Sequence, residues 1–245
     1  AMDAFGKSAT LSQTEQNERL KNLLLAIVHD VRVVLIELAL KLETLHEAFR
    51  TRDTVPNKAL AQLALDVHAP LASRLGIGQL KWELEDVAFR TLEPETYKHI
   101  AKQLESRRSE REAYIADVVA ELESSLAKEG IAGASISGRP KHIYGIVRKM
   151  RKKGVPFEEI FDASAIRVLL DDVASCYAVL GLVHGRWPPI AGEFDDYVAR
   201  PKPNGYQSLH TAVIGPQGRS VEVQIRTREM HRLAEFGVAC LLYTS

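Results

Sequence analysis

The chain has 245 residues, with 32 basic and 32 acidic side chains and only two cysteines. Two cysteines are too few for a disulfide framework, and no apolar run approaches the roughly 18 residues that a membrane span needs. We therefore expect a cytoplasmic protein with no signal peptide and no membrane contact, large enough for one large domain or two small ones.

The balanced net charge hides an uneven distribution. Residues 1–130 hold 17 basic and 21 acidic side chains, whereas residues 131–245 hold 15 and 11. Between Arg139 and Lys153 there are seven basic side chains and no acidic one. A local positive field of this kind points to an anionic ligand.

The first part of the chain has the pattern of a helical bundle. Residues 1–14 are expected to be disordered, and residues 15–130 form the helical region, with helices predicted over about 15–56, 57–75, 81–92 and 94–128. Apolar residues recur there at steps of three and four. The His29-Asp30 pair is similar to the metal-binding pair of a phosphohydrolase, but no second cluster accompanies it, so we interpret it as structural. We expect no loop suited to chemistry in this region.

The pattern changes after Gly130, where a second region, 131–245, is predicted to begin. A short basic helix is expected over 138–153, a strand over 165–170 and a helix over 173–186. Strands over 209–214 and 220–226 flank a hairpin turn, and a helix over 227–239 closes the chain. This order predicts an α+β fold, with a small mixed sheet on which helices pack.

The stretch from Glu193 to Thr211 concentrates acids, prolines, an Asn-Gly turn, an aromatic ring and an imidazole. Such a stretch is interpreted as the wall of a ligand site, and the alternative is a decorated surface turn. Tyr206 could stack on a base or pack into the core with its hydroxyl satisfied. His210 could bind a ligand or be structural.

The basic helix offers a second candidate site. Lys141, Gly145, Arg148 and Lys152 share one helical face, and a helix N-terminus also attracts anions. This favours phosphate binding. A solvated basic face and an RNA-binding patch are the alternatives.

Two acids complete the candidate chemistry. Asp162 precedes the strand 165–170, and Glu222 lies inside the strand 220–226. If these strands are neighbours, the two carboxylates could share a Mg²⁺ ion with substrate phosphates. The alternative is that Glu222 forms a cross-strand ion pair with Arg167.

Five ordered motifs in the second region resemble the RelA/SpoT family of (p)ppGpp synthetases. They are Gly138–Tyr144 with Arg148–Met150, Phe161–Arg167, Lys202–Thr211, Glu222–Thr227 and Ala234–Val238. Residues 15–130 resemble, more loosely, the C-terminal part of the family's hydrolase region with its connecting helices.

The resemblance implies a nucleotidyltransferase-like sheet domain that moves the β,γ-diphosphate of ATP to the 3′-hydroxyl of GTP or GDP in the stringent response. By motif position, ATP would be held by Arg139, Lys141 and Lys149. Asp162 and Glu222 would be catalytic and hold Mg²⁺, with Glu222 placed to activate the 3′-hydroxyl. The guanine nucleotide would contact Lys202, Asn204, Tyr206 and His210. Supporting roles would fall to Arg148, Arg167, Gln224 and Arg226.

Two departures from the family pattern refine the expectation. The acidic residues Glu193, Asp195 and Asp196 resemble the synthetase-only, RelA-type members and are expected to set metal preference. Leu40 stands where hydrolase-competent members have an aspartate, so we expect no hydrolase activity. Contact with the ribosome would require C-terminal domains outside this sequence. A catalytically silent guanine-nucleotide-binding module and an RNA- or ribosome-associated fragment remain the alternatives.

Overall fold

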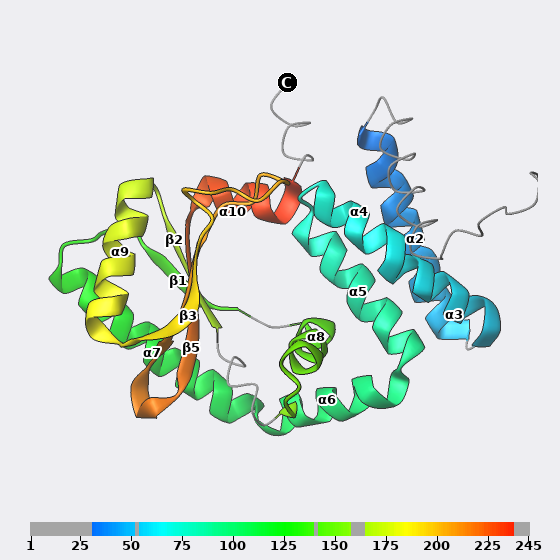
Figure 1. Cartoon of the computed structure of the whole chain (residues 1–245), viewed down its shortest axis with the longest axis horizontal. Coiled ribbons are helices and arrows are strands. Elements are labelled where there is room, and N and C mark those ends of the chain that lie inside the picture. The colour runs from blue at the N-terminus through cyan, green and yellow to red at the C-terminus, as the bar shows by residue number, and fades with distance from the viewer. Residues whose placement is uncertain (1–30, 52–53, 140–141, 158–164, 238–245) are drawn as a thin grey trace, which may run out of the picture.

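The computed structural model of the protein describes residues 31–51, 54–139, 142–157 and 165–237 (Figure 1). Most of the N-terminal helices gather on one side, and a five-stranded sheet with helices of its own lies on the other. No helix in these ranges combines the length and the apolar character that a membrane crossing requires.

The helical side is built from short elements that follow one another closely. They are α2 (Val31–Thr51), α3 (Thr54–Leu63), the π-helical η1 (Ala64–His68), α4 (Ala69–Arg74), α5 (Gly78–Leu92), α6 (Pro94–Ser106) and α7 (Arg108–Lys128). Leu38, Leu45, Leu84 and Ala88 are among the residues of its buried core. Gly76, with φ of +75°, lets the chain turn between α4 and α5.

The single helix predicted over 94–128 is wrong, because the chain breaks at Arg107, whose φ and ψ of −108° and 13° are not helical. Because of this break, α6 and α7 pack into different hydrophobic cores. Ile100 of α6 is buried beside the basic helix, whereas Tyr114, Val118 and Leu122 of α7 are buried in the core of the sheet.

The five strands form one mixed sheet in the order β1-β2-β5-β4-β3. The strands are β1 (Ser135–Gly138), β2 (Ala165–Leu170), β3 (Pro189–Asp196), β4 (Leu209–Ile214) and β5 (Ser220–Thr227). β2 and β5 are parallel, and the other pairs are antiparallel. The helices and the mixed sheet confirm the predicted α+β class.

Strands β1 and β3 were not predicted, and both lie at the edges of the sheet. Edge strands are often short, polar or bulged, because only one side of the strand is paired. β1 has a single apolar residue, Ile136, among serines and a glycine. β3 carries a register shift between Pro189 and Phe194, with Gly192 at φ +78°. Neither segment has the alternating apolar pattern that marks a strand in the sequence.

Helices α7 and α9 (Val173–Arg186) cover one face of the sheet, and their buried side chains share its core (Figure 1). The basic helix α8 (Ile143–Lys153) lies on the other side, where it packs on α5 and α6. Its Ile146 and Val147 are buried with Phe89, Ile100 and Phe157 in a separate cluster. Helix α7 lies before residue 130 but packs on the sheet. Helix α8 lies after residue 130 but packs on α5 and α6.

The C-terminal helix α10 (Arg228–Phe236) joins the two sides of the molecule. A Cβ atom built on Gly78, at the start of α5, would lie 2.6 Å from the carbonyl oxygen of Ala234 in α10. Glycine is therefore required where these two helices meet.

Candidate active site

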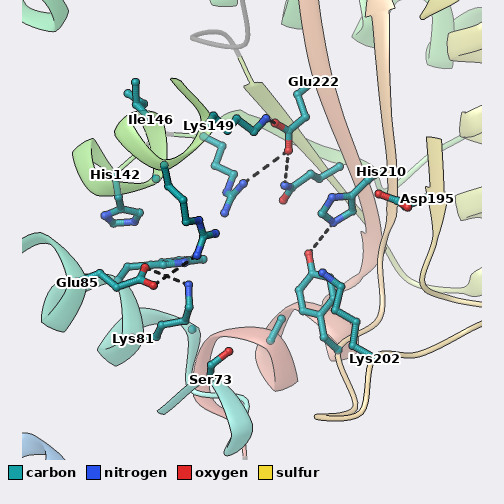
Figure 2. A pocket seen from close by; sticks show the side chains of 18 of the residues that line it. Ser73, Lys81, Glu85, His142, Ile146, Lys149, Asp195, Lys202, His210 and Glu222 are labelled. Carbon is teal, nitrogen blue, oxygen red and sulfur yellow. Dashed lines mark hydrogen bonds and ion pairs between the residues drawn. The ribbon is translucent and has the colours of Figure 1, made fainter. Parts of the chain in front are cut away.

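A pocket of about 500 Å³ lies between α5 and α8 on one side and the sheet on the other (Figure 2). Figure 2 shows Lys81 and Glu85 of α5 across the pocket from Glu222 and His210 of the sheet. Many of the predicted site residues line it: Arg139, Arg148, Lys149, Glu193, Asp195, Lys202, Asn204, Tyr206, His210, Glu222 and Gln224. Lys141 and Asp162 lie outside the described residues.

The Glu222 side chain stands at the centre of the basic part of the pocket and is 15% exposed. Its carboxylate lies 3.8 Å from Nη1 of Arg139 and 3.7 Å from Nζ of Lys149, and it accepts a hydrogen bond of 2.8 Å from Nε2 of Gln224. One carboxylate therefore organises two cations that come from different elements.

The register of the sheet bears on the alternative in which Glu222 pairs with Arg167. β2 and β5 are neighbours, as the metal hypothesis required, and Glu222 pairs with Ala165 across them. Arg167 is opposite Gln224 and forms its ion pair with Glu235 of α10, at 3.3 Å. The alternative of a Glu222–Arg167 ion pair is therefore wrong.

Arg167 and Arg226 support the pocket from behind and do not line it. Arg226 is 2% exposed and donates to Glu235 at 3.1 Å and to Nδ1 of His231 at 2.6 Å. Burial, together with the neighbouring charge of Arg226, lowers the pKa of Arg167 to about 10. Glu235 thus pairs with both guanidinium groups and holds β2, β5 and α10 together.

Tyr206 and His210 form a polar pair in the opposite wall. The Tyr206 hydroxyl lies 2.7 Å from Nε2 of His210. Desolvation lowers the pKa of His210 to about 4, so the ring is neutral at neutral pH and its Nε2 can accept the hydroxyl proton. Lys202 lies over the ring of Tyr197, 4.1 Å from its centroid, and 5.2 Å from that of Tyr206. The pocket therefore presents an aromatic ring beside a cation.

The Asn204 amide holds the turn that carries Tyr206. Its Nδ2 donates to the carbonyl of Ser73 at 2.7 Å, and its Oδ1 accepts from the backbone N–H of Tyr206 at 3.2 Å. Gly205 next to it has φ of +77°, which favours glycine. Asn204 thus connects the 201–206 turn to helix α4, as well as lining the pocket.

The acidic triplet, Glu193, Asp195 and Asp196, does not act as one unit. Glu193 pairs with Lys153 of α8 at 3.3 Å, and Asp195 lines the pocket at the position opposite His210. Asp196 instead accepts the backbone N–H groups of Val198 and Ala199, at 3.0 and 2.8 Å. Its carboxylate stabilises the loop after β3, outside the pocket lining.

The wall formed by α5 was missed, because no chemistry was expected in the helical region. Lys81, Trp82 and Glu85 all line the pocket. Glu85 accepts from Lys81 at 3.0 Å and lies 3.7 Å from Arg148 of α8, with its side chain 11% exposed. The only signal in the sequence was the Gly76-Ile-Gly78 segment, which allows a close approach of backbones.

Comparisons with known proteins agree with the motifs. Residues 138–244 match the family described as "Region found in RelA / SpoT proteins", and residues 2–78 match the family described as "HD domain". The chain is 50% identical over 228 residues to the GTP pyrophosphokinases of Photobacterium angustum and Escherichia coli K12, covering 93% and 92% of this chain. It is 44% identical over 242 residues to that of Myxococcus xanthus, covering 97% of this chain. The chain spans 30%, 30% and 31% of the length of these relatives.

Among solved structures, the chain is similar to the small alarmone synthetase 1 of Bacillus subtilis bound to its product pppGpp. The two are 22% identical with a TM-score of 0.46, and the match covers 58% of this chain and 81% of the other.

Proposed function

We propose that this chain, whose residues 138–244 belong to the RelA/SpoT family, is the catalytic part of a GTP pyrophosphokinase. It transfers the β,γ-diphosphate of ATP to the 3′-hydroxyl of GTP or GDP. The proposal is supported by the relatives of that name, which match nearly the whole chain at 50% identity. The observation that carries it is the Glu222 carboxylate, set between two cations and across from an aromatic ring.

The ATP side of the site is the cationic wall. Arg139 and Lys149 would bind the triphosphate, joined by Lys141 on the strength of its motif position. Arg148, held 3.7 Å from Glu85, would add charge at the same surface. Transfer of phosphoryl groups depends mostly on positioning and on neutralising charge, which is what several converging cations supply.

The acceptor side is the wall formed by β4 and the 201–206 turn. The Tyr206 ring would stack on the guanine, because its hydroxyl is already fixed by His210. Lys202 would bind phosphate oxygens of the acceptor. Asn204, whose amide bonds Ser73 and Tyr206, would act by placing the turn.

Glu222 would remove the proton of the 3′-hydroxyl. The freed oxygen forms a bond to the β-phosphorus of ATP, and the bond from that phosphorus to the oxygen bridging it to the α-phosphorus breaks. AMP leaves with the electron pair of that bond. Arg139 and Lys149, which neutralise Glu222 in the free protein, would turn to the phosphates when ATP binds.

Among the described residues, Glu222 would suit a metal that arrives with the nucleotide, because its carboxylate lines the pocket. In the described ranges no group of three or more His, Cys, Asp or Glu side chains could hold an ion alone. Mg²⁺ commonly takes one or two carboxylates, with substrate phosphates and water as further ligands. Glu222 and Asp162 would provide those carboxylates, and Mg²⁺ when bound would neutralise charge on the transferred diphosphate.

The RNA-binding alternative is less well supported by the basic helix. Arg148 is 3.7 Å from Glu85, and Arg151 is paired with Glu93 at 2.6 Å. Lys153 is paired with Glu193. Three of the basic side chains of α8 are thus paired with acids of neighbouring elements.

Product analysis tests the proposal. With ATP, GTP and Mg²⁺, the chain should produce AMP and a GTP derivative heavier by two phosphates. Formation of ADP would indicate transfer of a single phosphoryl group and contradict it. Absence of any product from the folded chain at high concentration would also contradict it.

A further inference from the structure

We propose that helix α5 is a positioning element for the ATP wall of the pocket, acting on α8 and Arg139 through Trp82, Asp86 and Glu93. None of the three is expected to touch the reacting atoms. The inference rests on the proposed function, because it assumes that the basic face of α8 binds the triphosphate. Trp82 and Asp86 act near the start of α8, where both contact His142, and Glu93 acts near its end.

The first observation is where α8 is anchored. Its buried residues Ile146 and Val147 pack with Phe89 of α5 and Ile100 of α6. The core of the sheet is a different cluster, which includes none of these residues. Figure 1 shows α8 lying against the helical side, with the sheet facing it. The orientation of α8 therefore depends on α5 and α6.

The second observation is that α5 supplies the N-terminal cap of α8. The first backbone N–H groups of any helix lack partners within the helix, and a side chain usually provides one. The N-cap residue His142 provides no side-chain cap. Asp86 of α5 does so instead, accepting the N–H of Tyr144 at 2.9 Å and lying 3.5 Å from Nδ1 of His142.

The third observation is a clamp at the other end of α8. Nη2 of Arg151 lies 2.7 and 2.6 Å from the two carboxylate oxygens of Glu93, the residue that follows α5. The hydrogen bond lowers the pKa of Glu93 and raises that of Arg151, as expected for a formed ion pair. Tyr144 and Arg151 are about two turns apart. Holding both ends fixes the rotation of α8 about its axis, and with it the direction of Arg148 and Lys149.

Trp82 extends the same support to Arg139. The Trp82 ring is stacked on that of His142, with centroids 4.8 Å apart and an angle of 27° between the planes. The guanidinium carbon of Arg139 lies 5.2 Å from the Trp82 ring centroid, within range of a cation–π contact. One helix thus places Arg139 as well as the cations of α8.

The test uses Asp86→Ala, Trp82→Ala and Glu93→Arg, with Glu95→Gln as a matched control. Glu95 is an acid at the start of α6 whose partner is the exposed Lys98. Binding of a non-hydrolysable ATP analogue and of GTP is measured by calorimetry. The ATP analogue should bind roughly 3- to 10-fold more weakly to the first three variants, in keeping with the loss of one cap or ion pair. GTP affinity should be unchanged.

Reversing both charges of the Glu93–Arg151 pair tests whether the pair positions α8 or has only a general structural role. Glu93→Arg combined with Arg151→Glu should recover ATP affinity to within about twofold of the wild type, because the pair re-forms with opposite signs. Affinities for ATP and GTP that fall together, or no rescue, would overturn the inference. Unchanged ATP affinity in all three variants would overturn it as well.

Hydrogen exchange of the ligand-free protein keeps this inference distinct from the proposed function. Amides of residues 143–153 should exchange faster in Asp86→Ala and Glu93→Arg than in the wild type and in Glu95→Gln, while β5 is unchanged. This result does not require that the chain bind ATP. Equal protection of α8 in all variants would show that α5 does not hold it, whatever the chain catalyses.

Discussion

Replacing Glu222 by glutamine should separate nucleotide binding from chemistry, because the carboxylate has two opposing effects. It lies 3.8 Å from Arg139 and 3.7 Å from Lys149, the cations proposed to bind ATP. Unit charges about 4 Å apart interact by roughly 4 kcal/mol at an effective dielectric constant of about 20. Desolvation and solvent screening offset most of this, since the Lys149 side chain is 41% exposed.

About 1 kcal/mol of the attraction between Glu222 and the two cations remains, and this remainder opposes ATP binding in the wild type. Glutamine keeps the shape of the side chain and its hydrogen bond to Gln224, but it leaves both cations available to the triphosphate. ATP without divalent metal should therefore bind about 3- to 10-fold more tightly to the variant. The transfer rate should fall about 10²–10⁴-fold, because an amide cannot take the 3′-hydroxyl proton.

Calorimetry with a non-hydrolysable ATP analogue and single-turnover kinetics measure the two effects separately. Glu110→Gln is the matched control, since Glu110 pairs with Arg219 away from the pocket lining. It should leave both quantities unchanged. Weaker metal-free ATP binding together with a near-normal rate would refute the reasoning, because Glu222 would then be neither a competitor for the cations nor the base.

Three further predictions address stability and metal use. His210 has a pKa of about 4 in the folded chain against about 6.5 when unfolded, so the unfolded state binds more protons as pH falls from 6.5 to 4. Urea titrations should show the free energy of unfolding falling by up to about 1.4 kcal/mol per pH unit from this site, and a His210→Gln variant with the wild-type slope would contradict that. In thermal unfolding, Gly78→Ala should lower the free energy of unfolding by about 1–3 kcal/mol, because the added Cβ would clash with the carbonyl oxygen of Ala234. The control Gly181→Ala should not be destabilised, because a Cβ there would meet no atom. Glu193→Arg with Asp195→Lys should change the relative rates with Mg²⁺ and Mn²⁺, and an unchanged ratio would leave these acids a structural role.

The elements that the sequence predicted well are those whose pattern reflects burial. The strands β2 and β4 and the helix α9 have the predicted bounds, and β5 differs by one residue. Val221, Val223 and Ile225 alternate on β5 and are fully buried, so the apolar period of two was informative. The edge strands carry no such pattern, because one of their sides is unpaired.

The site was predictable where one motif carried the chemistry and not where two distant segments meet. Glu222 and His210 lie in motifs on β5 and β4, and Tyr206 lies in the motif just before β4. Trp82 and Glu85 reach the pocket only because α5 packs beside α8, some sixty residues further along the chain. A helical period cannot tell which face of α5 meets a partner helix and which one meets a ligand.

The expectation that the three acids act together failed because the strand β3 was not recognised in the sequence. Three acids within four residues were treated as one feature, but a strand turns successive side chains to opposite faces. Glu193 and Asp195 face the pocket, whereas Asp196 bonds the loop that follows β3. The strand itself was hidden by its polar sequence, so this alternation could not be applied.

The most direct measurement of the central claim compares GTP with 3′-deoxy-GTP as the acceptor. Both should bind with similar affinity, because the contacts proposed for Tyr206 and Lys202 involve the base and the phosphates. AMP should form from ATP in the presence of Mg²⁺ and GTP, in equal amount with the 3′-diphosphorylated product, and should not form above the no-acceptor background with 3′-deoxy-GTP. Equal AMP formation with both acceptors would show that the 3′-hydroxyl is not the acceptor group and would contradict the account.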